Sequence, residues 1–443
     1  MAMCLSMGTA QAQTLQQLFL TADRESQSVR VSEAALKAAD EAVEQARSAM
    51  LPNVGLSITG SYIGNATLMT RGFSTSGTSD VIVAGLGPQS VSNGKQDTPH
   101  WGNSFTAQVS QVIYAGGAIS AGIRMAELGR QISELDLRRN QQEVRFLIAG
   151  QYLDLCKLRN QQDVVEKNIS LTEQVISNMQ ARLEQGTVLK NDITRYEYQL
   201  KSLELTREQL RDAASIINHQ IITTLHMPEQ TVITPQMQAV DDEITALKAA
   251  DSEQQWQEMA ASNNIGIQQA SLAKTISDEK VKAVRAASLP SLALVAEDNL
   301  FGPYTNDLIP TNANVNAWFV GVGLKYNLSS LWNNKHAIRK ARREAEQQRE
   351  SVTLAREGVE NGVRACYVNF LTAYKEVETQ QKQVQLAEEN FSVVQNRYDN
   401  QLALLTDMLD ASNMKLSAEM SLVNARIALL YSYYKLRYTA SML

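Results

Sequence analysis

The chain has 443 residues, of which 44% are apolar and 20% are charged, so it can bury a large core. Only 8 prolines and 22 glycines occur, which excludes a collagen-like or low-complexity chain. The formal net charge of −6 gives no reason to expect nucleic acid as a partner. Aromatic residues make up only 6%, a composition that favours long helices.

The first twelve residues are uncharged and end in Ala10-Gln11-Ala12, which is typical of a signal-peptide cleavage site. No basic segment precedes them, so residues 1–12 are either a truncated secretory signal, which we favour, or no signal at all. Lipid attachment at Cys4 is a further alternative, although Met3 is a poor fit to the small residue usually needed before the cysteine. The sequence contains no run of about 18 uncharged apolar residues, so it predicts no transmembrane helix.

The residues that usually carry catalysis or bind metals are scattered. The cysteines Cys4, Cys156 and Cys366 form no CxxC pair and no histidine clusters with them, so we expect neither a zinc site nor a disulfide framework. The sequence contains no GxSxG, HExxH or phosphate-loop motif. It therefore predicts no enzyme, no metal and no cofactor.

The chain contains two copies of one plan. Pairs of identical residues recur at a fixed offset of 215, namely Ile123-Arg124 and Ile338-Arg339, Tyr152 and Tyr367, Arg182 and Arg397, and Asp192 and Asp407. The segments Leu51-Pro52 and Leu289-Pro290 are 238 residues apart, so the first copy has a longer insertion, within residues 64–104. Each proline follows a helical pattern, which it is expected to end.

We divide the chain into a first repeat at 13–226, a mixed segment at 227–263 and a second repeat at 264–443. The elements predicted in the first repeat are a helix at 15–50, strands at 53–63 and 104–114, a long helix at 118–184, a tip at 185–192 and a return helix at 192–225. The corresponding elements in the second repeat are a helix at 264–288, strands at 291–300 and 317–328, a long helix at 331–400, a tip at 400–406 and a return helix at 404–438.

The long helical runs contain no proline and have the spacing of a coiled coil. In the second long helix, apolar residues from Ala345 to Tyr398 are spaced by sevens, threes and fours, with one shift of phase between Ala373 and Val377. A helix of 67 residues is about 100 Å long, far longer than a compact domain requires. Such a helix must belong to a rod or to the wall of a tube.

The four predicted strands alternate apolar and polar residues. Trp318, Val320, Val322 and Leu324 point to one side, and Phe105, Ala107, Val109 and Ile113 oppose Thr106, Gln108, Ser110 and Tyr114. This pattern fits either a small soluble sheet with one wet face or tilted membrane-spanning strands. Four strands cannot close a barrel alone and an open edge cannot face lipid, so the membrane interpretation requires an oligomer; a trimer supplies twelve strands.

With these features the chain resembles the TolC family of outer-membrane efflux channels. The resemblance covers the two repeats with their Leu-Pro junctions, and the strand-to-helix turn Val112-Ile113-Tyr114-Ala115-Gly116-Gly117. It is most specific at the two tips, where Arg182–Val188 leads into Asp192 and Arg397-Tyr398 leads into Asp407-Met408-Leu409-Asp410-Ala411. The last segment is similar to the family's DVLDA tip with one substitution.

The resemblance implies a mainly α fold with membrane β structure: a homotrimer with a periplasmic coiled-coil tunnel continued by a shared 12-stranded β-barrel in the outer membrane of a Gram-negative bacterium. It implies a passive exit duct for tripartite efflux or type I secretion. The implied partners are a periplasmic adaptor (membrane fusion) protein and an inner-membrane pump of the RND, ABC or MFS type.

Candidate site residues follow from the same resemblance. Asp407 and Asp410 are implied to form stacked acidic rings at the pore constriction, although two solvated carboxylates near a helix N-terminus need no such role. Asp192 and Tyr398 match positions that link the closed gate. Ala403 replaces an expected arginine and Gln401 an expected glycine, so the linkages of this gate must differ from the family pattern or be weaker.

Two further groups complete the predicted site. The residues expected to dock an adaptor at the tips are Gly186, Thr187, Val188, Gln401, Leu402 and Ala403. The aromatic residues expected at the membrane interfaces are Tyr62, Trp101, Tyr114, Trp318, Tyr326 and Trp332. The main alternative is a soluble or periplasmic coiled-coil scaffold with a small sheet, which would be released by lysis rather than fractionate with the outer membrane.

Overall fold

The computed structural model describes residues 12–62, 64, 66–67, 80–83, 87–90, 95–96, 100–186, 188–247, 252–303, 313–400 and 402–443. Its contacts divide the chain into two compact units. Unit 1 comprises the described residues of Met1–Glu41, Glu127–Ser277 and Ala345–Leu443. Unit 2 comprises those of Ala42–Ala126 and Asp278–Glu344.

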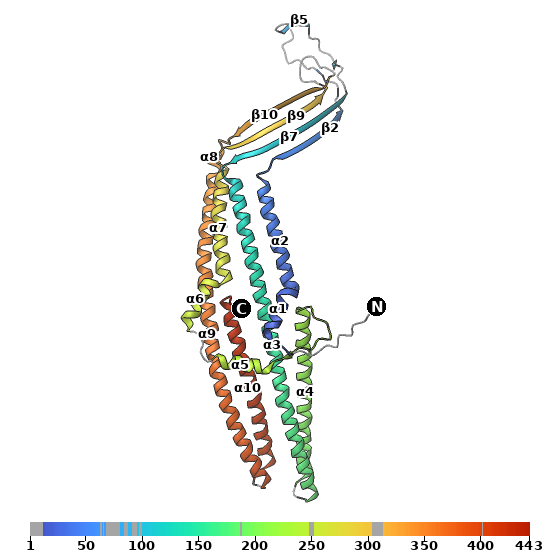
Figure 1. Ribbon diagram of the computed structural model, residues 1–443, viewed down its shortest axis with the longest axis vertical. Coiled ribbons are helices and arrows are strands. Elements are labelled where there is room, and N and C mark those ends of the chain that lie inside the picture. Colours follow the sequence, from blue (N-terminus) through green and yellow to red (C-terminus); the bar gives the residue numbers. More distant parts are fainter. Residues whose placement is uncertain are drawn as a thin grey trace. The chain divides into compact units, whose positions relative to one another are not determined.

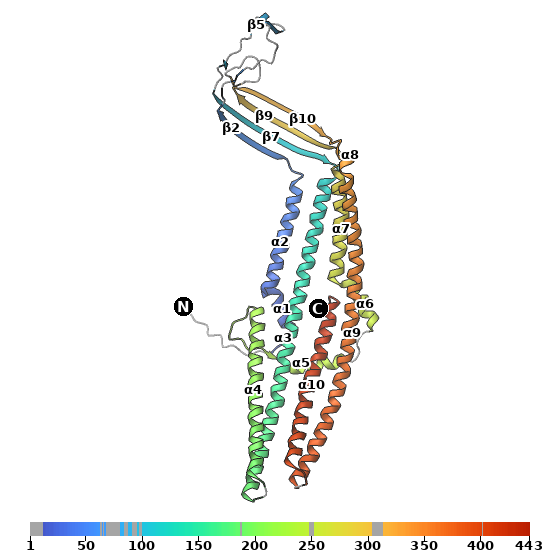
Figure 2. The ribbon, with the colours of Figure 1, turned by 180° about the vertical axis from the view of Figure 1, so that it is seen from behind.

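The chain is mainly helical (Figure 1, and from behind in Figure 2). The helices are α1 (Leu15–Glu25), α2 (Gln27–Ser48), α3 (Ala118–Glu184), α4 (Lys190–Thr224), α5 (Met237–Ala246), α6 (Glu253–Asn263), α7 (Ile265–Ala286), α8 (Ser330–Asn333), α9 (Lys335–Asp399) and α10 (Leu405–Thr439). The bounds of α3 coincide with those predicted from the sequence. No helix in the described ranges combines the length and the apolar character needed to cross a membrane.

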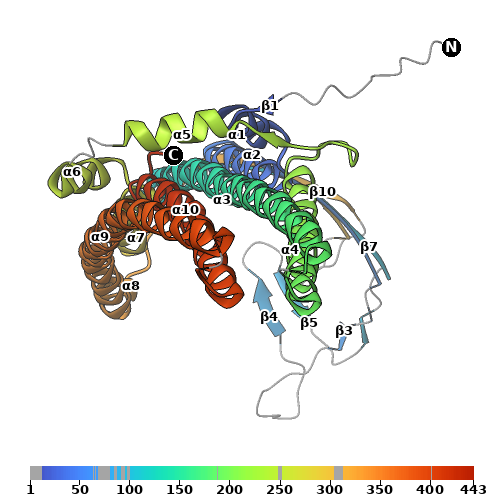
Figure 3. The same ribbon diagram turned by 90° about the horizontal axis from the view of Figure 1, so that it is seen from below.

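Unit 1 is a curved layer of helices. Figure 3 shows α4, α3, α10 and α9 side by side in this layer, with α5 and α6 on its convex side. A buried cluster joins the layer to α1 and α5, with Tyr152 and Phe370 among its largest side chains. The Tyr152 hydroxyl accepts a hydrogen bond of 3.0 Å from the Gln236 backbone, and the Tyr434 hydroxyl donates one of 2.8 Å to Glu243 on α5. A short pair of parallel strands, β1 (Ala12–Gln13) and β8 (Thr234–Pro235), lies beside this core.

Three predicted segments differ from the structure. The predicted helix at 15–50 is two helices, because Ser26 takes an extended conformation and is 2% exposed between them. The mixed segment at 227–263 contains α5 and α6, and α6 begins at a capping box formed by Ser252 and Gln255. The second long helix is preceded by the separate single turn α8. Apolar spacing alone does not reveal a break of one residue or a short capped helix.

Unit 2 contains a four-stranded antiparallel sheet. Its strands are β2 (Asn53–Tyr62), β7 (Trp101–Ala115), β9 (Ser291–Gly302) and β10 (Val315–Lys325), in the order β10-β9-β7-β2. No other described strand pairs with β2 or β10, so both are edges. Two further antiparallel pairs of short strands are formed by β3 (Ala66–Thr67) with β6 (Lys95–Gln96) and by β4 (Asp80–Val83) with β5 (Gly87–Ser90).

One face of the sheet is mostly apolar, with the exposed Asp298 as an exception in the row of Leu56 and Trp318, and the other face is more polar. Strand register places Val54, Val109, Ala296 and Val320 in one row, and directly opposed residues share a face. The other face carries Ser57, Thr106 and Asn299, and Thr106 donates a hydrogen bond of 3.1 Å to the Asn299 side chain. The apolar face is open to the surroundings: Val54 is 72% exposed and Val322 is 64% exposed.

One predicted side-chain direction in this sheet is wrong. Strict alternation places Ile113 with the apolar residues of its strand and Tyr114 with the polar ones. A β-bulge between Val112 and Tyr114 inserts an extra residue, so Tyr114 pairs with Leu292, which lies on the apolar face. The bulge therefore moves the tyrosine ring to the same side as the other large apolar side chains of the sheet.

The turn from β7 into α3 depends on a glycine. Gly116 has a φ of +63°, and a Cβ atom there would lie 2.7 Å from the carbonyl oxygen of Ala286, the last residue of α7. Gly122, one turn into α3, has open space around the position of a Cβ atom. The backbone conformation and close packing at position 116 therefore require glycine, whereas position 122 has room for a larger residue.

We expect Gly116→Ala to destabilise the protein by more than about 1 kcal/mol, because alanine disfavours positive φ and its methyl group meets the α7 terminus. Gly122→Ala should stabilise it by up to about 1 kcal/mol, because alanine is the better helix former. Thermal unfolding of the purified full chain, followed by circular dichroism, measures both. Effects of the same sign would contradict the conformation described for this turn.

Candidate functional site at the helix tips

Each long helix of unit 1 ends in a tight turn that leads into its return helix. After α3, Gly186 takes a φ of +70° and its N–H donates to the Leu183 carbonyl, so the glycine ends the helix. After α9, the N–H of Leu402 donates to the Arg397 carbonyl at 2.7 Å. The two tips are therefore built by different local means, in keeping with the glycine that the first tip has and the second lacks.

An apolar cluster joins the two tips. Its buried members come from both hairpins and are Ile176, Met179, Ile193, Tyr196, Phe391, Leu405, Met408 and Ala411. Val188 and Tyr398 pack against it while partly exposed. Because residues of α3, α4, α9 and α10 share this cluster, the α3–α4 and α9–α10 hairpins are held together at their ends within one chain.

A charged contact also links the tips. The Arg182 guanidinium, at the end of α3, donates a hydrogen bond of 2.7 Å to the Asp399 backbone carbonyl, at the end of α9. The Asp399 carboxylate lies 3.8 Å from the same guanidinium. Sequence reasoning missed this link, because the repeat relates Arg182 to Arg397 and no spacing pairs the ends of α3 and α9.

The two residues predicted as gate links come together within one chain. Tyr398 is partly buried, and its pKa is raised first by burial and then by the nearby carboxylates of Asp192 and Asp399, against the opposing charge of Arg182. Among the described residues no hydrogen bond joins Asp192 to Tyr398. Neighbouring Tyr196 is 2% exposed, and its buried hydroxyl has no hydrogen-bond partner within the described ranges; burial and the proximity of Tyr398 and Asp399 raise its pKa.

The two candidate pore-mouth carboxylates lie in the first turns of α10 and are both exposed. The Asp407 carboxylate accepts a hydrogen bond of 3.1 Å from the Leu404 N–H, so it caps the helix. Asp410, three residues on, shares the face of α10 with Asp407. Asp407 thus has a structural role, whereas Asp410 forms no ion pair or hydrogen bond within the described part of the chain.

The predicted docking residues occupy the ends of the tips. Gly186 and Leu402 are exposed, the latter by 69%, while Ala403 and Val188 are partly covered. Thr187 and Gln401 lie outside the described residues. The described tips therefore present exposed apolar side chains at Leu189, which is 70% exposed, and at Leu402 and its neighbour Leu404, which is also 69% exposed.

The six predicted interface aromatics are all exposed, between 42% for Tyr326 and 80% for Trp101. Tyr62 and Trp101 are paired across β2 and β7, with ring centroids 5.6 Å apart in an edge-to-face arrangement. Trp318 lies level with Leu56, six residues along β2 from Tyr62. Trp318 and the Tyr62–Trp101 pair therefore lie at different levels of the sheet and not in one row.

Within the described ranges, no group of three or more histidine, cysteine, aspartate or glutamate residues is placed to hold a metal ion.

Comparison with known proteins identifies the fold. The model of the outer membrane efflux protein family matches residues 20–219 and 256–439. The outer membrane efflux protein BepC of Brucella suis is 22% identical over 365 residues, which are 79% of this chain and 75% of that protein. The solved structure of VceC, an outer membrane protein of Vibrio cholerae, has a TM-score of 0.74 at 15% identity and covers 96% of both chains. The outer-membrane channel OprN also gives a TM-score of 0.74 at 15% identity, over 97% of this chain and 90% of that one.

The fold and the tips thus define an outer-membrane channel of the TolC-like class, as the sequence resemblance implies. This chain belongs to the outer membrane efflux protein family. The family consists of passive outer-membrane efflux channels of tripartite efflux systems in Gram-negative bacteria, which are not enzymes, and membership places the protein in the outer membrane with a periplasmic portion.

We expect Arg182→Gln to loosen the tip more than Asp399→Asn does. The arginine variant loses the short hydrogen bond to a backbone carbonyl, a change of about 1–2 kcal/mol. The aspartate variant keeps that carbonyl and loses only a long, exposed charge contact, a change below about 0.5 kcal/mol. Amide hydrogen exchange of the peptide covering 394–410 reports the local opening free energy, and faster exchange in Asp399→Asn than in Arg182→Gln would contradict the geometry.

Proposed function

We propose that three copies of this chain form a passive exit duct of a tripartite efflux or type I secretion system. Four strands from each copy close a 12-stranded barrel in the outer membrane. The helices form the wall of the periplasmic tunnel. The tips form its gate and dock a periplasmic adaptor protein, which connects the duct to an inner-membrane pump.

One observation carries this proposal: the apolar face of the sheet is exposed and both of its edges are unpaired among the described strands. A soluble scaffold would bury that face, and a single copy in lipid would leave the backbone groups of β2 and β10 without partners. Pairing β2 of one copy with β10 of the next satisfies both requirements.

The strand directions support this closure. Each neighbour in the order β10-β9-β7-β2 is antiparallel, so β2 and β10 run in opposite directions. A ring of identical copies therefore joins β2 to β10 as a further antiparallel pair, and the whole barrel has a single pattern of hydrogen bonding. With four strands per copy, three copies give an even number of strands, as bacterial outer-membrane barrels have.

The two faces of β2 provide a test. Leu56→Arg places a charge on the face assigned to lipid and should destabilise the assembled barrel by about 2–4 kcal/mol. Ser57→Arg, the matched control, places the same charge on the polar face and should change stability by less than about 1 kcal/mol. The fraction of outer-membrane protein that migrates as a trimer without heating measures both variants. Equal losses of the trimer in the two variants would contradict the assignment of the Leu56 face to lipid.

The gate has contacts of two kinds, the apolar cluster and the polar links of Arg182 and Tyr398. The family pattern has an arginine at the position of Ala403. In this chain Arg182 takes its role, because its guanidinium extends from the first tip to the second. Opening a tip requires the α9–α10 hairpin to move away from α3–α4. An adaptor that binds the exposed tip residues Gly186 and Leu402, together with Thr187, Val188, Gln401 and Ala403, can supply that energy.

In a trimer, Asp407 and Asp410 form two acidic rings that favour cations at the mouth. The double variant Asp407→Asn/Asp410→Asn should lower the cation-to-anion permeability ratio by about twofold or more. Asparagine at 407 still accepts the Leu404 N–H, so the cap is kept. The charge-matched control is Asp242→Asn/Glu258→Gln, on the exposed surfaces of α5 and α6. Planar-bilayer recordings that show the same selectivity in all three proteins would take the aspartates out of the pore mouth.

A further inference from the structure

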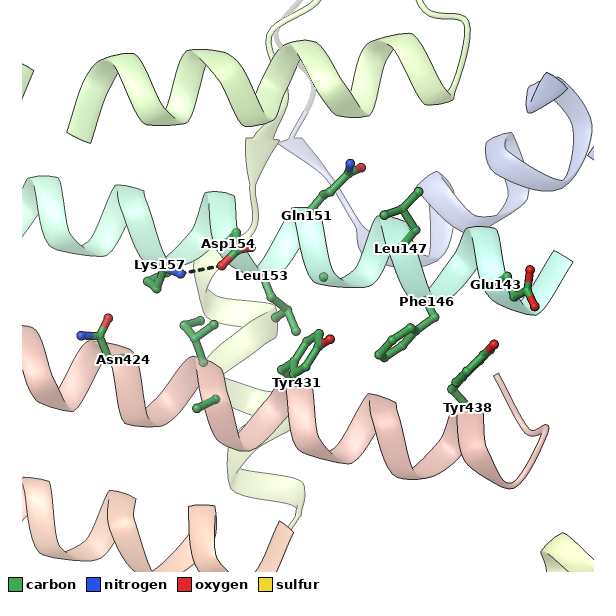
Figure 4. Close-up of a pocket in the computed structure, with 13 residues that line it drawn as sticks. Glu143, Phe146, Leu147, Gln151, Leu153, Asp154, Lys157, Asn424, Tyr431 and Tyr438 are labelled. Carbon is green, nitrogen blue, oxygen red and sulfur yellow. Dashed lines mark hydrogen bonds and ion pairs between the residues drawn. The ribbon is translucent and has the colours of Figure 1, made fainter. Parts of the chain in front are cut away.

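Unit 1 has a pocket of about 670 Å³ between α3 and α10. Its volume falls in the range of sites that bind drug-sized molecules. Figure 4 shows the rings of Phe146, Tyr431 and Tyr438 between the two helices, with Glu143 at one end of the pocket and Asn424 at the other. The lining belongs to neither the tips nor the sheet.

The three aromatic rings form one wall. Phe146 stacks on Tyr438 with ring centroids 4.8 Å apart and an interplanar angle of 13°, and lies 5.4 Å from Tyr431. Tyr431 is 40% exposed and neighbouring Leu147 is 49% exposed. Large apolar side chains are thus open to solvent on two helices that also supply many buried residues of the core.

A glycine keeps the pocket open. Gly150 lies inside α3, where glycine is destabilising relative to alanine. A Cβ atom at this position would already touch the Tyr431 ring, 3.4 Å from Cε2. Any side chain larger than alanine at position 150 would occupy the space in front of that ring.

The charge of the pocket is negative. Lys157 pairs with Asp154 at 2.5 Å, which leaves Glu143 as an exposed carboxylate with no ion pair in the described part of the chain. Glu143 is close enough to Tyr438 to raise the pKa of that hydroxyl, after the larger effect of burial and against the opposing charge of Arg139, which itself lies 3.7 Å from Asp136. A carboxylate beside the stacked rings of Phe146 and Tyr438 is complementary to an organic cation.

The pocket lies on the face of α3 opposite the convex side of unit 1. Tyr152, which reaches the backbone at the start of α5, points away from the positions 143, 146, 150, 154 and 157 by roughly half a helical turn. A curved layer that closes with copies of itself encloses its concave face, so this pocket opens into the proposed tunnel. That placement rests on the proposed function, whereas binding in the pocket does not.

We propose that the α3–α10 pocket is a binding site for aromatic organic cations, which lie against the aromatic rings that include Tyr431, with the Glu143 carboxylate at one end of the pocket. The rings of Phe146 and Tyr438 supply the apolar surface, and Asn424 and Gln151 supply polar contacts. In the duct, each copy provides one such transient binding site for cationic amphipathic molecules on the tunnel wall.

The test uses the full-length protein in lipid nanodiscs and ethidium as the probe, with binding followed by fluorescence anisotropy. Glu143→Gln should weaken binding at least about threefold and Tyr431→Ala at least about fivefold, because each removes one part of the cation site. Gly150→Leu should abolish binding by filling the pocket. The matched control Glu173→Gln removes an exposed charge from another face of α3 and should bind as the unmodified protein does. Circular dichroism confirms that each variant is folded.

The proposal is overturned if the unmodified protein does not bind ethidium, or if Glu143→Gln and Tyr431→Ala bind it as well as Glu173→Gln does. It is also overturned if the anionic aromatic probe 8-anilinonaphthalene-1-sulfonate binds to the pocket as tightly as ethidium does. Conductance of the unmodified protein in planar bilayers separates this outcome from the proposed duct. A conducting protein that fails to bind ethidium contradicts the pocket alone, and ethidium binding without conductance contradicts the duct alone.

Discussion

The constraint on which the structure depends is the sheet of unit 2, which one chain cannot complete. Ile58 on β2 is 75% exposed and Leu324 on β10 is 71% exposed, and both strands lack a neighbour on one side among the described residues. In hydrocarbon each unpaired backbone group costs several kcal/mol, whereas an exposed apolar side chain is stable there. The same surface that would aggregate in water is therefore suited to lipid once the edges are paired.

The helices of unit 1 depend on other contacts, which join the α3–α4 and α9–α10 hairpins into one layer. Apolar clusters provide most of this packing, and side-chain hydrogen bonds add to it along the layer: Gln161 with Asn424 at 2.8 Å and Gln199 with Asn413 at 2.9 Å. Contacts of this kind are modest in free energy and can be exchanged for contacts with a partner. They add to the packing of the two hairpins without making their separation prohibitive.

The sequence predicted the long helices well because proline-free heptads have few alternative structures. It predicted the apolar face of the sheet because alternation sets the direction of side chains. It failed at Ile113 and Tyr114, where a bulge changes the phase, and at Ser26, where one extended residue divides a helix. It also missed Arg182 with Asp399 and the pocket beside Gly150, because both join segments far apart in the chain and depend on side-chain positions that no periodicity encodes.

The stoichiometry of the protein extracted from the outer membrane tests the central claim most directly. Native mass spectrometry in a mild detergent should detect a single assembly of three chains, the number that supplies the twelve strands of the proposed barrel and pairs every β2 with a β10. A stable monomer would leave the edges unpaired, and an assembly of two chains would require a barrel of another size. Either result would contradict the closure of the sheet by three copies of the chain.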